Sequence, residues 1–271
     1  MATRGPSSIT ASAPGSVTPI FVPPQSPQDG SLGVSFAIED GVDAVVEPST
    51  DTSVSLDEEP TTFEPVEGVL RQLDVSAAVS LTASVPVGYG FGASGAATLA
   101  TALAANEAFD LGRSREELLE AAHRAEVEAG TGLGDVFIQD RGGLVWNTGD
   151  GLQRSELSAD LEYTAVDGIA TSTVLDDEQT VERVRECGQE SLSRFSPEIS
   201  LRELLDLSWK FVQRSGFATD RVIEEVQRVE QDGGAASMAM LGETVIATGG
   251  QNVLERTTRI SNEGAILAAG S

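Results

Sequence analysis

The segment SVPVGYGFGASGAATLATALAAN, residues 84–106, decides how the rest of this chain is interpreted. Its four glycines are Gly88, Gly90, Gly92 and Gly95. They precede an uncharged run rich in Ala and Leu, which predicts a helix over 94–109. A helix N-terminus leaves backbone N–H groups unpaired and carries partial positive charge, so it can hold a phosphate without a lysine. Because glycines allow close approach and positive φ, the segment predicts a phosphate cradle, although a tight strand-to-helix turn is the simpler alternative.

Two familiar phosphate loops do not explain this segment. A Walker A loop needs Gly-Lys-Ser/Thr, and no lysine stands here. A Rossmann pattern is matched literally by Gly90, Gly92 and Gly95, but it also requires an acid about 20 residues later at the end of a second parallel strand. Asp110 comes too early and follows the predicted helix. An NAD(P)-binding oxidoreductase therefore remains only the alternative from a different class.

The composition excludes several classes of partner. The chain has 271 residues, with 43 Asp and Glu against 17 Lys and Arg, for a net charge of −26. Such a chain repels nucleic acid and anionic membranes, so we expect neither as a partner. Because the acidic residues are spread along the chain, we favour a cytosol of high salt, where self-repulsion is screened, over a specific cationic partner. No apolar run of membrane-spanning length and no apolar signal core occur, so we expect a cytoplasmic protein.

The order of predicted elements is mixed, which favours an α+β fold over a doubly wound sheet. Residues 9–22 predict two strands broken by a turn at Pro14-Gly15, and residues 32–48 predict a hairpin that turns at Glu39-Asp40-Gly41. Residues 114–130 predict an amphipathic helix, with Ser114 and Glu117 as a capping box and Gly130 at its end. Three helices are predicted at 178–195, 200–216 and 219–234, and two strands within 235–250. A change of pattern near residue 155 predicts two domains, 1–155 and 156–271.

Three segments carry a resemblance to a known superfamily. PVGYGFGASGAA (86–97) resembles the PxGxGLGSSAA motif of the GHMP kinases, which include galactokinase, homoserine kinase and mevalonate kinase. ASAPGSVTPIF (11–21) and DGGAASMAMLGETVIA (232–247) stand where that superfamily has its first and third motifs. The resemblance spans most of the chain. It implies a two-domain fold, with an N-terminal domain like domain 2 of ribosomal protein S5 and a ferredoxin-like C-terminal domain.

Within the superfamily, the chain most resembles the archaeal pantoate kinases. The segments that carry this likeness are AHRAE (122–126), TGLGDV (131–136) and ASMAMLG (236–242), together with the glycine loop. The resemblance implies ATP-dependent phosphorylation of (R)-pantoate to (R)-4-phosphopantoate in archaeal coenzyme A biosynthesis. A homoserine, mevalonate-type or shikimate kinase remains the alternative within the fold, and a nucleotide sensor without catalysis is a third.

The same resemblance assigns roles to residues. It implies that ATP is held by Pro86, Gly88, Gly90, Phe91, Gly92, Ala93, Ser94 and Gly95. It implies that Mg²⁺ is bound by Ser94 and Glu126, with Glu128 as the alternative to Glu126. It places Asp135 at the acceptor hydroxyl as a base or an orienting group. As a bare residue, Asp135 could equally be the N-cap of a helix at 136–140.

Binding of pantoate requires groups for its carboxylate. Ser16 stands where many GHMP kinases have a lysine, and His123 shares the predicted helix with Glu126. Arg141 is the preferred cation for the carboxylate, because arginine can bind it through two parallel hydrogen bonds, and Arg124 and Arg4 are alternatives. The sequence does not decide the oligomeric state. A homodimer, the commonest oligomer, is the assembly expected if the chain associates.

Overall fold

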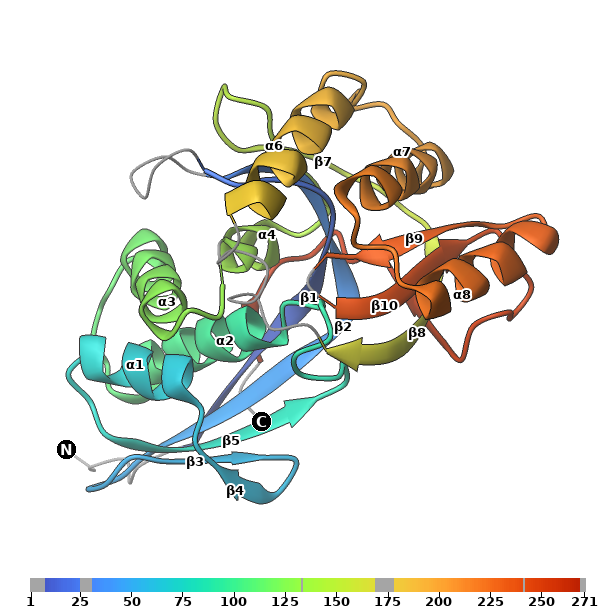
Figure 1. Ribbon diagram of the computed structural model, residues 1–271. Coiled ribbons are helices and arrows are strands. Elements are labelled where there is room, and N and C mark those ends of the chain that lie inside the picture. Colours follow the sequence, from blue (N-terminus) through green and yellow to red (C-terminus); the bar gives the residue numbers. More distant parts are fainter. Residues whose placement is uncertain (1–7, 25–30, 133, 169–177, 241, 269–271) are drawn as a thin grey trace.

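The computed structural model describes residues 8–24, 31–132, 134–168, 178–240 and 242–268 (Figure 1). Within these residues the strands form two sheets, and the α+β class is confirmed. The first sheet contains β1 (Ile9–Val22), β2 (Leu32–Pro48), β3 (Ser53–Leu56), β4 (Glu59–Thr61), β5 (Ala77–Ala83), β6 (Leu144–Asn147), β7 (Gln153–Ser155) and β12 (Ile266–Leu267). The second contains β8 (Asp160–Gly168), β9 (Ala235–Ala239), β10 (Gly242–Thr248) and β11 (Arg256–Arg259). The helices are α1 (Glu64–Gln72), α2 (Ala93–Ala108), α3 (Arg115–Ala129), α4 (Asp135–Arg141), α6 (Glu178–Leu192), α7 (Leu201–Ser215) and α8 (Asp220–Gln231).

The topology does not favour the dinucleotide-binding alternative. The main path of the first sheet is β12-β1-β2-β5-β3-β4, and its central pairs β1·β2 and β2·β5 are antiparallel. The second sheet, in the order β11-β8-β10-β9, is antiparallel throughout its described strands. The glycine loop joins β5 to α2, and α2 is followed by α3 rather than by a second parallel strand. The βαβ unit that a Rossmann site requires is therefore missing from this part of the chain.

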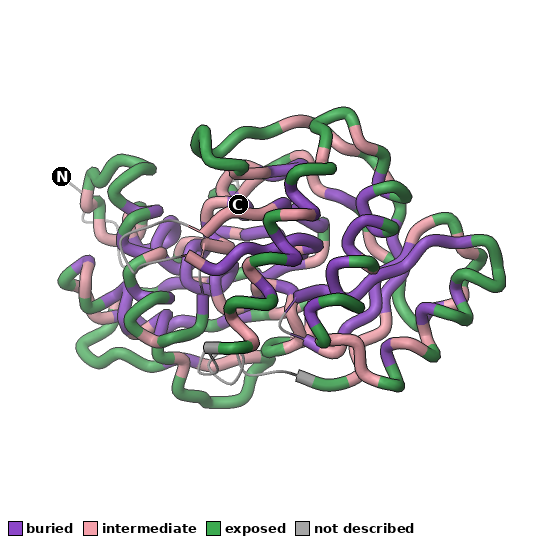
Figure 2. The backbone as a smooth tube through the Cα atoms, turned by 45° about the horizontal axis from the view of Figure 1, so that its top comes forward, coloured by how far each residue is buried: buried purple, intermediate pink, exposed green. Residues whose placement is uncertain are grey.

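Helix α2 is the central helix of the N-terminal half. It contacts β1 and β2 on one side and α1 and α3 on the other, as Figure 1 shows. Its residues from Gly95 to Ala105 are all buried, and Figure 2 shows the buried backbone, in purple, concentrated in the interior of the molecule. Small uncharged side chains fit this position because a helix covered on both sides cannot keep a polar face in water. In the second half, α7 and α8 pack on β9.

The predicted caps of α3 are confirmed. Ser114 accepts a hydrogen bond from the backbone of Glu117, and the Glu117 side chain accepts one from the Ser114 backbone N–H. Gly130 ends the helix at φ 70°, in the left-handed conformation. The cap at Gly130 fixes where the chain leaves α3 for Thr131 and Gly132, which line the site described below.

The predicted turns at the start of the chain are wrong, because β1 and β2 are each continuous. Pro14 pairs with Gly41 and Gly15 pairs with Ile38, so Glu39 and Asp40 form a bulge within β2. A Cβ at Gly41 would lie 2.1 Å from the Ala13 carbonyl oxygen. The glycine that suggested a turn is needed instead for the close approach of two bent strands.

Along the chain, β7 of the first sheet ends at Ser155, and β8, the first strand of the second sheet, begins at Asp160. We propose that the domains divide here, at 1–155 and 156–271. The last described strand, β12, returns to the first sheet, where Leu267 pairs with Ala11. No helix in the described ranges has the length and apolar character needed to cross a bilayer.

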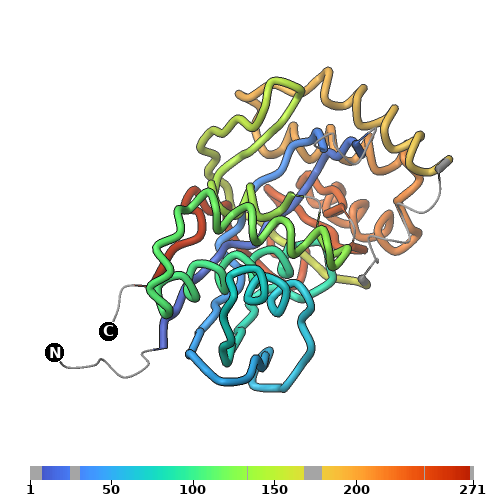
Figure 3. Tube along the Cα trace, turned by 90° about the vertical axis from the view of Figure 1, so that its left-hand side faces the viewer, coloured from blue at the N-terminus to red at the C-terminus, as the bar shows by residue number. Residues whose placement is uncertain are grey.

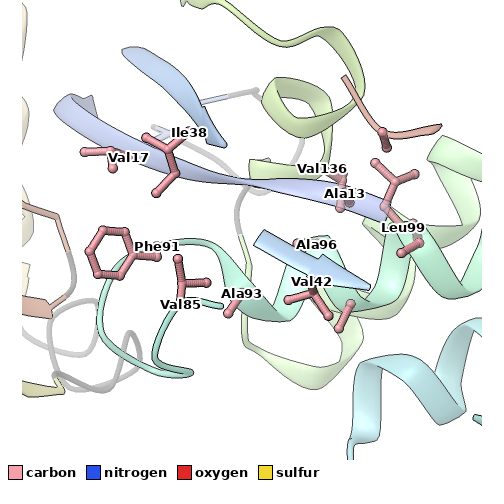
Figure 4. Close-up of a cluster of buried hydrophobic side chains, with 14 of the residues drawn as sticks. Ala13, Val17, Ile38, Val42, Val85, Phe91, Ala93, Ala96, Leu99 and Val136 are labelled. Atoms are coloured by element: carbon pink, nitrogen blue, oxygen red, sulfur yellow. The ribbon is translucent and has the colours of Figure 1, made fainter. Parts of the chain in front are cut away.

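The buried side chains join the glycine loop to the core. Figure 4 shows Phe91, Val85 and Ala93 in one cluster with Val17 of β1 and Ile38 of β2. The ring of Phe91 also lies edge-on to Tyr163 of β8, with ring centroids 4.8 Å apart. Contacts to both sheets therefore hold the loop that begins α2.

Candidate active site

The glycine loop ends at Gly92, the N-cap of α2. Gly88, Gly90 and Gly92 have φ values of 87°, 84° and 61°, in the left-handed region that favours glycine. No side chain caps α2, so the first N–H groups of the helix are available to an anion. The backbone N–H of Ser16 donates to the carbonyl oxygen of Phe91 at 2.8 Å and anchors the loop to β1. The loop therefore reaches α2 through glycines of positive φ and leaves the start of the helix without a side-chain cap.

The third sequence motif lies directly beside the loop. A Cβ at Gly90 would lie 2.9 Å from the Met240 carbonyl oxygen, and one at Gly242 would lie 2.3 Å from the Tyr89 carbonyl carbon. The hydroxyl of Thr244 donates to the Tyr89 carbonyl oxygen at 2.7 Å. Thr244 and Tyr89 are 155 residues apart in the chain, yet the backbones of the two motifs touch, which fixes the outer part of the loop.

A cavity of about 300 Å³ opens beside the start of α2. Its wall on the loop side includes Gly88, Gly90, Gly92, Ala93 and Ser94. The wall at the other end is formed by Thr18, Phe21, Ser31, Leu32, Gly33, Ser35, Val145, Trp146, Asn147 and Leu152. His123, Thr131, Gly132, Gly134, Asp135, Phe137, Ile138 and Met240 complete the described lining. The cavity therefore extends from the glycine loop to a mixed apolar and hydroxyl-bearing pocket of the size that a small ligand needs.

Segments from both halves of the chain pack against residues at the far end of the cavity. Figure 3 shows the β6–β7 hairpin beside α6, and the rings of Trp146 and Phe195 lie 5.7 Å apart. A Cβ at Gly188 of α6 would lie 2.3 Å from the Phe21 carbonyl oxygen. The close packing of α6 on β1 thus shapes the pocket next to Phe21.

Asp135 and Ser16 meet at the inner end of the cradle. The Ser16 hydroxyl donates to Oδ1 of Asp135 at 2.8 Å. Asp135 is the first residue of α4, and the N-cap is Gly134, so the alternative in which Asp135 caps that helix is wrong. Burial raises the pKa of the Asp135 carboxyl above its usual value, and the bond from Ser16 opposes that shift. The pair places a carboxylate beside the helix end at which a phosphate would bind.

Glu126 forms the second polar group of the site. Its Oε1 accepts hydrogen bonds from the hydroxyls of Ser94 and Thr98, each at 2.8 Å, and its Oε2 accepts one from Thr131 at 3.0 Å. Glu126 is only 2% exposed, and burial raises the pKa of its carboxyl. No ion pair to Glu126 occurs among the described residues. A buried carboxylate without a counter-charge is costly, so a cation bound here would stabilise it.

The structure separates the two candidate glutamates. Glu128 is exposed, and its side chain accepts a hydrogen bond from Gln72 at 3.4 Å, away from Ser94. Glu126, not Glu128, is therefore brought to Ser94. Ser94 itself lines the cavity while its hydroxyl hydrogen faces Glu126, which leaves the lone pairs of Oγ available to a metal ion.

The predicted substrate residues fall into two groups. His123 lines the cavity, its ring centroid lies 4.9 Å from that of Phe137, and its buried Nδ1 has no partner. Burial lowers the pKa of the His123 imidazole, which favours its neutral form. Arg141 does not line the cavity; its guanidinium donates to the Phe137 carbonyl oxygen at 3.4 Å. Arg124 is exposed on α3, and Arg4 lies outside the described residues.

Three polar residues of the site were not foreseen from the sequence. Gln139, which is fully buried, donates through Nε2 to the Gly92 carbonyl oxygen at 2.6 Å. Thr98 and Thr131 complete the hydroxyl set around Glu126. Gln139 and Thr98 stand four residues after Asp135 and Ser94, a spacing that puts both members of a pair on one helix face. That spacing was the signal available in the sequence.

The sequence and the fold resemble those of known proteins. Residues 63–143, from the residue before α1 through the residue before β6, match the model of the GHMP kinases N terminal domain. The match includes the glycine loop, Glu126 and Asp135. The chain is 28% identical to the pantoate kinase of Methanospirillum hungatei JF-1 over 257 residues, covering 89% of this chain and 87% of that protein. It is 26% identical to the pantoate kinase of Methanocaldococcus jannaschii, covering 90% and 93% of the two chains.

The similarity extends to a solved structure. A protein described as a phosphotransferase related to the CoA biosynthesis pathway superposes with a TM-score of 0.82 at 23% identity, over 97% of this chain and 99% of that one. At this identity the superposition establishes the fold. The GHMP kinase fold predicted from the three motifs is therefore confirmed.

Proposed function

We propose that this GHMP kinase transfers the γ-phosphoryl group of ATP to the 4-hydroxyl of (R)-pantoate and forms (R)-4-phosphopantoate for coenzyme A biosynthesis. Similarity to pantoate kinases over about nine-tenths of the chain supports the choice of acceptor. The observation that carries the chemistry is the Ser16–Asp135 pair beside the uncapped start of α2. It puts a proton acceptor next to the place where the phosphate of ATP would bind.

In this mechanism the hydroxyl oxygen of pantoate forms a bond to the γ-phosphorus of ATP. The bond between that phosphorus and the β–γ bridging oxygen breaks, and ADP leaves with the electron pair. Asp135 orients the attacking hydroxyl and takes its proton, because a carboxylate that accepts one bond from Ser16 retains further acceptor capacity. The loop N–H groups at the start of α2 hold the phosphates of ATP.

The Mg²⁺ ion that this chemistry calls for fits the residues present. The Ser94 hydroxyl and the buried Glu126 carboxylate would hold it, which suits an ion that takes few protein ligands and keeps several waters. No cluster of three or more acidic, His or Cys side chains suited to a metal occurs in the described residues, so a site that supplies all its ligands from protein is not implied. When bound, the ion would neutralise charge on the β- and γ-phosphates. Thr98 and Thr131 would keep the Glu126 carboxylate turned toward it.

The acceptor site has little positive charge of its own. No Arg or Lys stands in the described lining of the cavity, where His123 is the side chain that can become positively charged. We assign His123 to the pantoate site, because a bound carboxylate would favour the imidazolium form of His123. Ser16 is 1% exposed and lies outside the described cavity lining, so we assign it to holding Asp135 rather than to direct contact with pantoate. Arg141 remains a candidate only if the segment that holds it moves toward the cavity when pantoate binds. This scarcity of cations makes the Mg²⁺ ion and the α2 N-terminus the main sources of charge neutralisation.

The test is a coupled ATP-turnover assay in about 2–3 M KCl with Mg²⁺, since high salt screens the acidic surface. Pantoate is compared with homoserine, mevalonate and shikimate, and Asp135→Asn serves as the matched variant with the shape but not the charge of Asp135. Turnover with pantoate, absent or much weaker with the other alcohols, is the expected result. Preference for another alcohol would change the acceptor assigned here but would leave the phosphoryl transfer from ATP in place. No turnover by folded protein with any acceptor would overturn the kinase assignment.

A further inference from the structure

Gln139 lies at the centre of the site without lining the cavity. Its side chain is 0% exposed and stands on α4 one turn after Asp135. Nε2 lies 2.6 Å from the Gly92 carbonyl oxygen and 3.4 Å from the Ser16 hydroxyl oxygen. The orientation of the amide follows from this contact, because a carbonyl oxygen only accepts hydrogen bonds. Oε1 is then left buried without a partner.

Two glycines of the loop motif leave the space that this amide occupies. A Cβ at Gly92 would lie 2.8 Å from Nε2 of Gln139, and a Cβ at Gly95 would lie 2.8 Å from its Oε1. The Gly92 carbonyl oxygen also accepts the first hydrogen bond of α2, from Ala96 at 3.0 Å. The Gln139 amide is thus a second donor to the N-cap carbonyl, and it ties the start of α2 to α4.

The same nitrogen sets the direction of the Ser16 hydroxyl. Nε2 carries two hydrogens, of which one bonds to Gly92 and the other faces the lone pairs of Ser16 Oγ. The hydroxyl hydrogen of Ser16 is then directed to Asp135. One buried amide therefore connects the phosphate loop, Ser16 and the helix that carries Asp135.

We propose that Gln139 is a positioning residue for phosphoryl transfer, which fixes the α2 N-cap and the Ser16–Asp135 pair relative to each other. The inference rests on the proposed function, in that it assigns Asp135 to the acceptor hydroxyl and α2 to the phosphates. Gln139 itself touches neither ATP nor the acceptor. If Gln139 served packing alone, an apolar side chain of equal size would fill the same space and leave no buried oxygen unpaired. A packing role therefore does not explain why this position carries a hydrogen-bond donor.

The test compares Gln139→Met, which retains length and volume, with Thr101→Val as a matched control. Thr101 is also fully buried, its hydroxyl has no partner, and it lies on α2 away from the described cavity lining. For Gln139→Met we expect kcat to fall about 10- to 100-fold, as is usual when reacting groups shift by about 1 Å. The KM for the acceptor should change less than about threefold, because no contact to the acceptor is lost. Thr101→Val should retain the wild-type kcat.

A double-mutant cycle separates positioning from packing. If Gln139 acts through Ser16, then Gln139→Met should lower kcat much less in a Ser16→Ala background than in the wild type. Equal fold-losses in both backgrounds would overturn the connection to Ser16. A folded Gln139→Met enzyme with wild-type kcat would overturn the proposal as a whole.

Amide hydrogen exchange tests the same inference without activity. Residues 88–95 should exchange several-fold faster in Gln139→Met than in the wild type and in Thr101→Val. Unchanged exchange in this loop would contradict the proposal whatever acceptor the enzyme uses. If Gln139→Met does not fold, Gln139→Glu takes its place, and failure of both to fold would assign the side chain to packing and overturn the proposal.

Failure of the proposed function is recognised separately. It would be seen in the wild-type enzyme as turnover with another alcohol, and the ratio of variant to wild type would then be measured with that alcohol. The inference about Gln139 depends on this ratio and on the exchange of the loop, whereas the choice of pantoate does not affect either.

Discussion

Ser16 and Asp135 stand 119 positions apart in the chain and are joined by a hydrogen bond of 2.8 Å. Ser16 comes from β1 and Asp135 from the first turn of α4. Between them lies Gly92, whose missing side chain leaves room for both: a Cβ there would lie 2.2 Å from Ser16 Oγ and 3.2 Å from Asp135 Oδ1. The proposed catalytic pair therefore depends on a glycine of the phosphate loop.

The first prediction concerns the pH profile of Ser16→Ala. Burial raises the pKa of Asp135 and the Ser16 hydrogen bond lowers it, so removal of that bond should raise the pKa further. Asp135 accepts a proton only when ionised, and activity is therefore lost as pH falls through its pKa. The acid limb of kcat/KM should move to higher pH in Ser16→Ala. An acid limb that stays in place would argue against Asp135 as the proton acceptor.

The second prediction concerns the metal ligands. Ser94→Ala and Glu126→Gln should each lower kcat about 10²-fold or more, the scale on which a preorganised charge-stabilising group acts. Both should also lose most of the rise in melting temperature that Mg²⁺ adds to ADP binding, which differential scanning fluorimetry measures. Glu128→Gln, on the surface of the same helix as Glu126, is the control and should retain both properties. A full Mg²⁺ effect in Glu126→Gln would remove Glu126 from the metal site.

The third prediction tests the glycine between the catalytic pair. Gly92→Ala should abolish measurable turnover, because its methyl group would displace Ser16 and the amide of Gln139. Gly112→Ala is the matched control: Gly112 also has positive φ, at 64°, but a Cβ there meets nothing within 4 Å. The control should lose about 1–2 kcal/mol of stability, the cost of a left-handed conformation with a side chain, and no activity. Comparable turnover by folded Gly92→Ala would show that the close packing at this point is dispensable.

The fourth prediction follows from the charge of the chain. With a net charge of −26, folding gathers repelling carboxylates onto one surface, and salt screens that repulsion. The melting temperature should rise steadily between about 0.1 and 2 M KCl, over which the Debye length falls to about 3 Å or less. Equimolar NaCl is the comparison that separates screening from binding of a particular cation. A melting temperature independent of salt would contradict the proposal of a high-salt cytosol.

Local features were predictable where one segment supplied its own constraint. The caps of α3 at Ser114 and Gly130 are confirmed because the capping groups lie within the residues that they satisfy. The two strands predicted within 235–250 are confirmed as β9 and β10, although Gly242 and Glu243, which suggested a turn, belong to β10. The turns predicted at Pro14 and Gly41 are wrong, because these residues pair with each other at a bulge between β1 and β2 and do not end the strands.

The features of the candidate site also divide into those predictable from a short segment and those set by tertiary packing. The sequence by itself determined the resemblance to the GHMP kinases, the glycine loop and the candidates Ser94, Glu126 and Asp135, because each belongs to a short motif whose chemistry depends on neighbouring residues. Only the tertiary structure decided that Ser16 bonds to Asp135, that Glu126 rather than Glu128 meets Ser94, and that Arg141 lies outside the cavity lining. These outcomes depend on how β1, α2, α3 and α4 pack together, and packing between distant segments is set by the shapes of all their side chains at once.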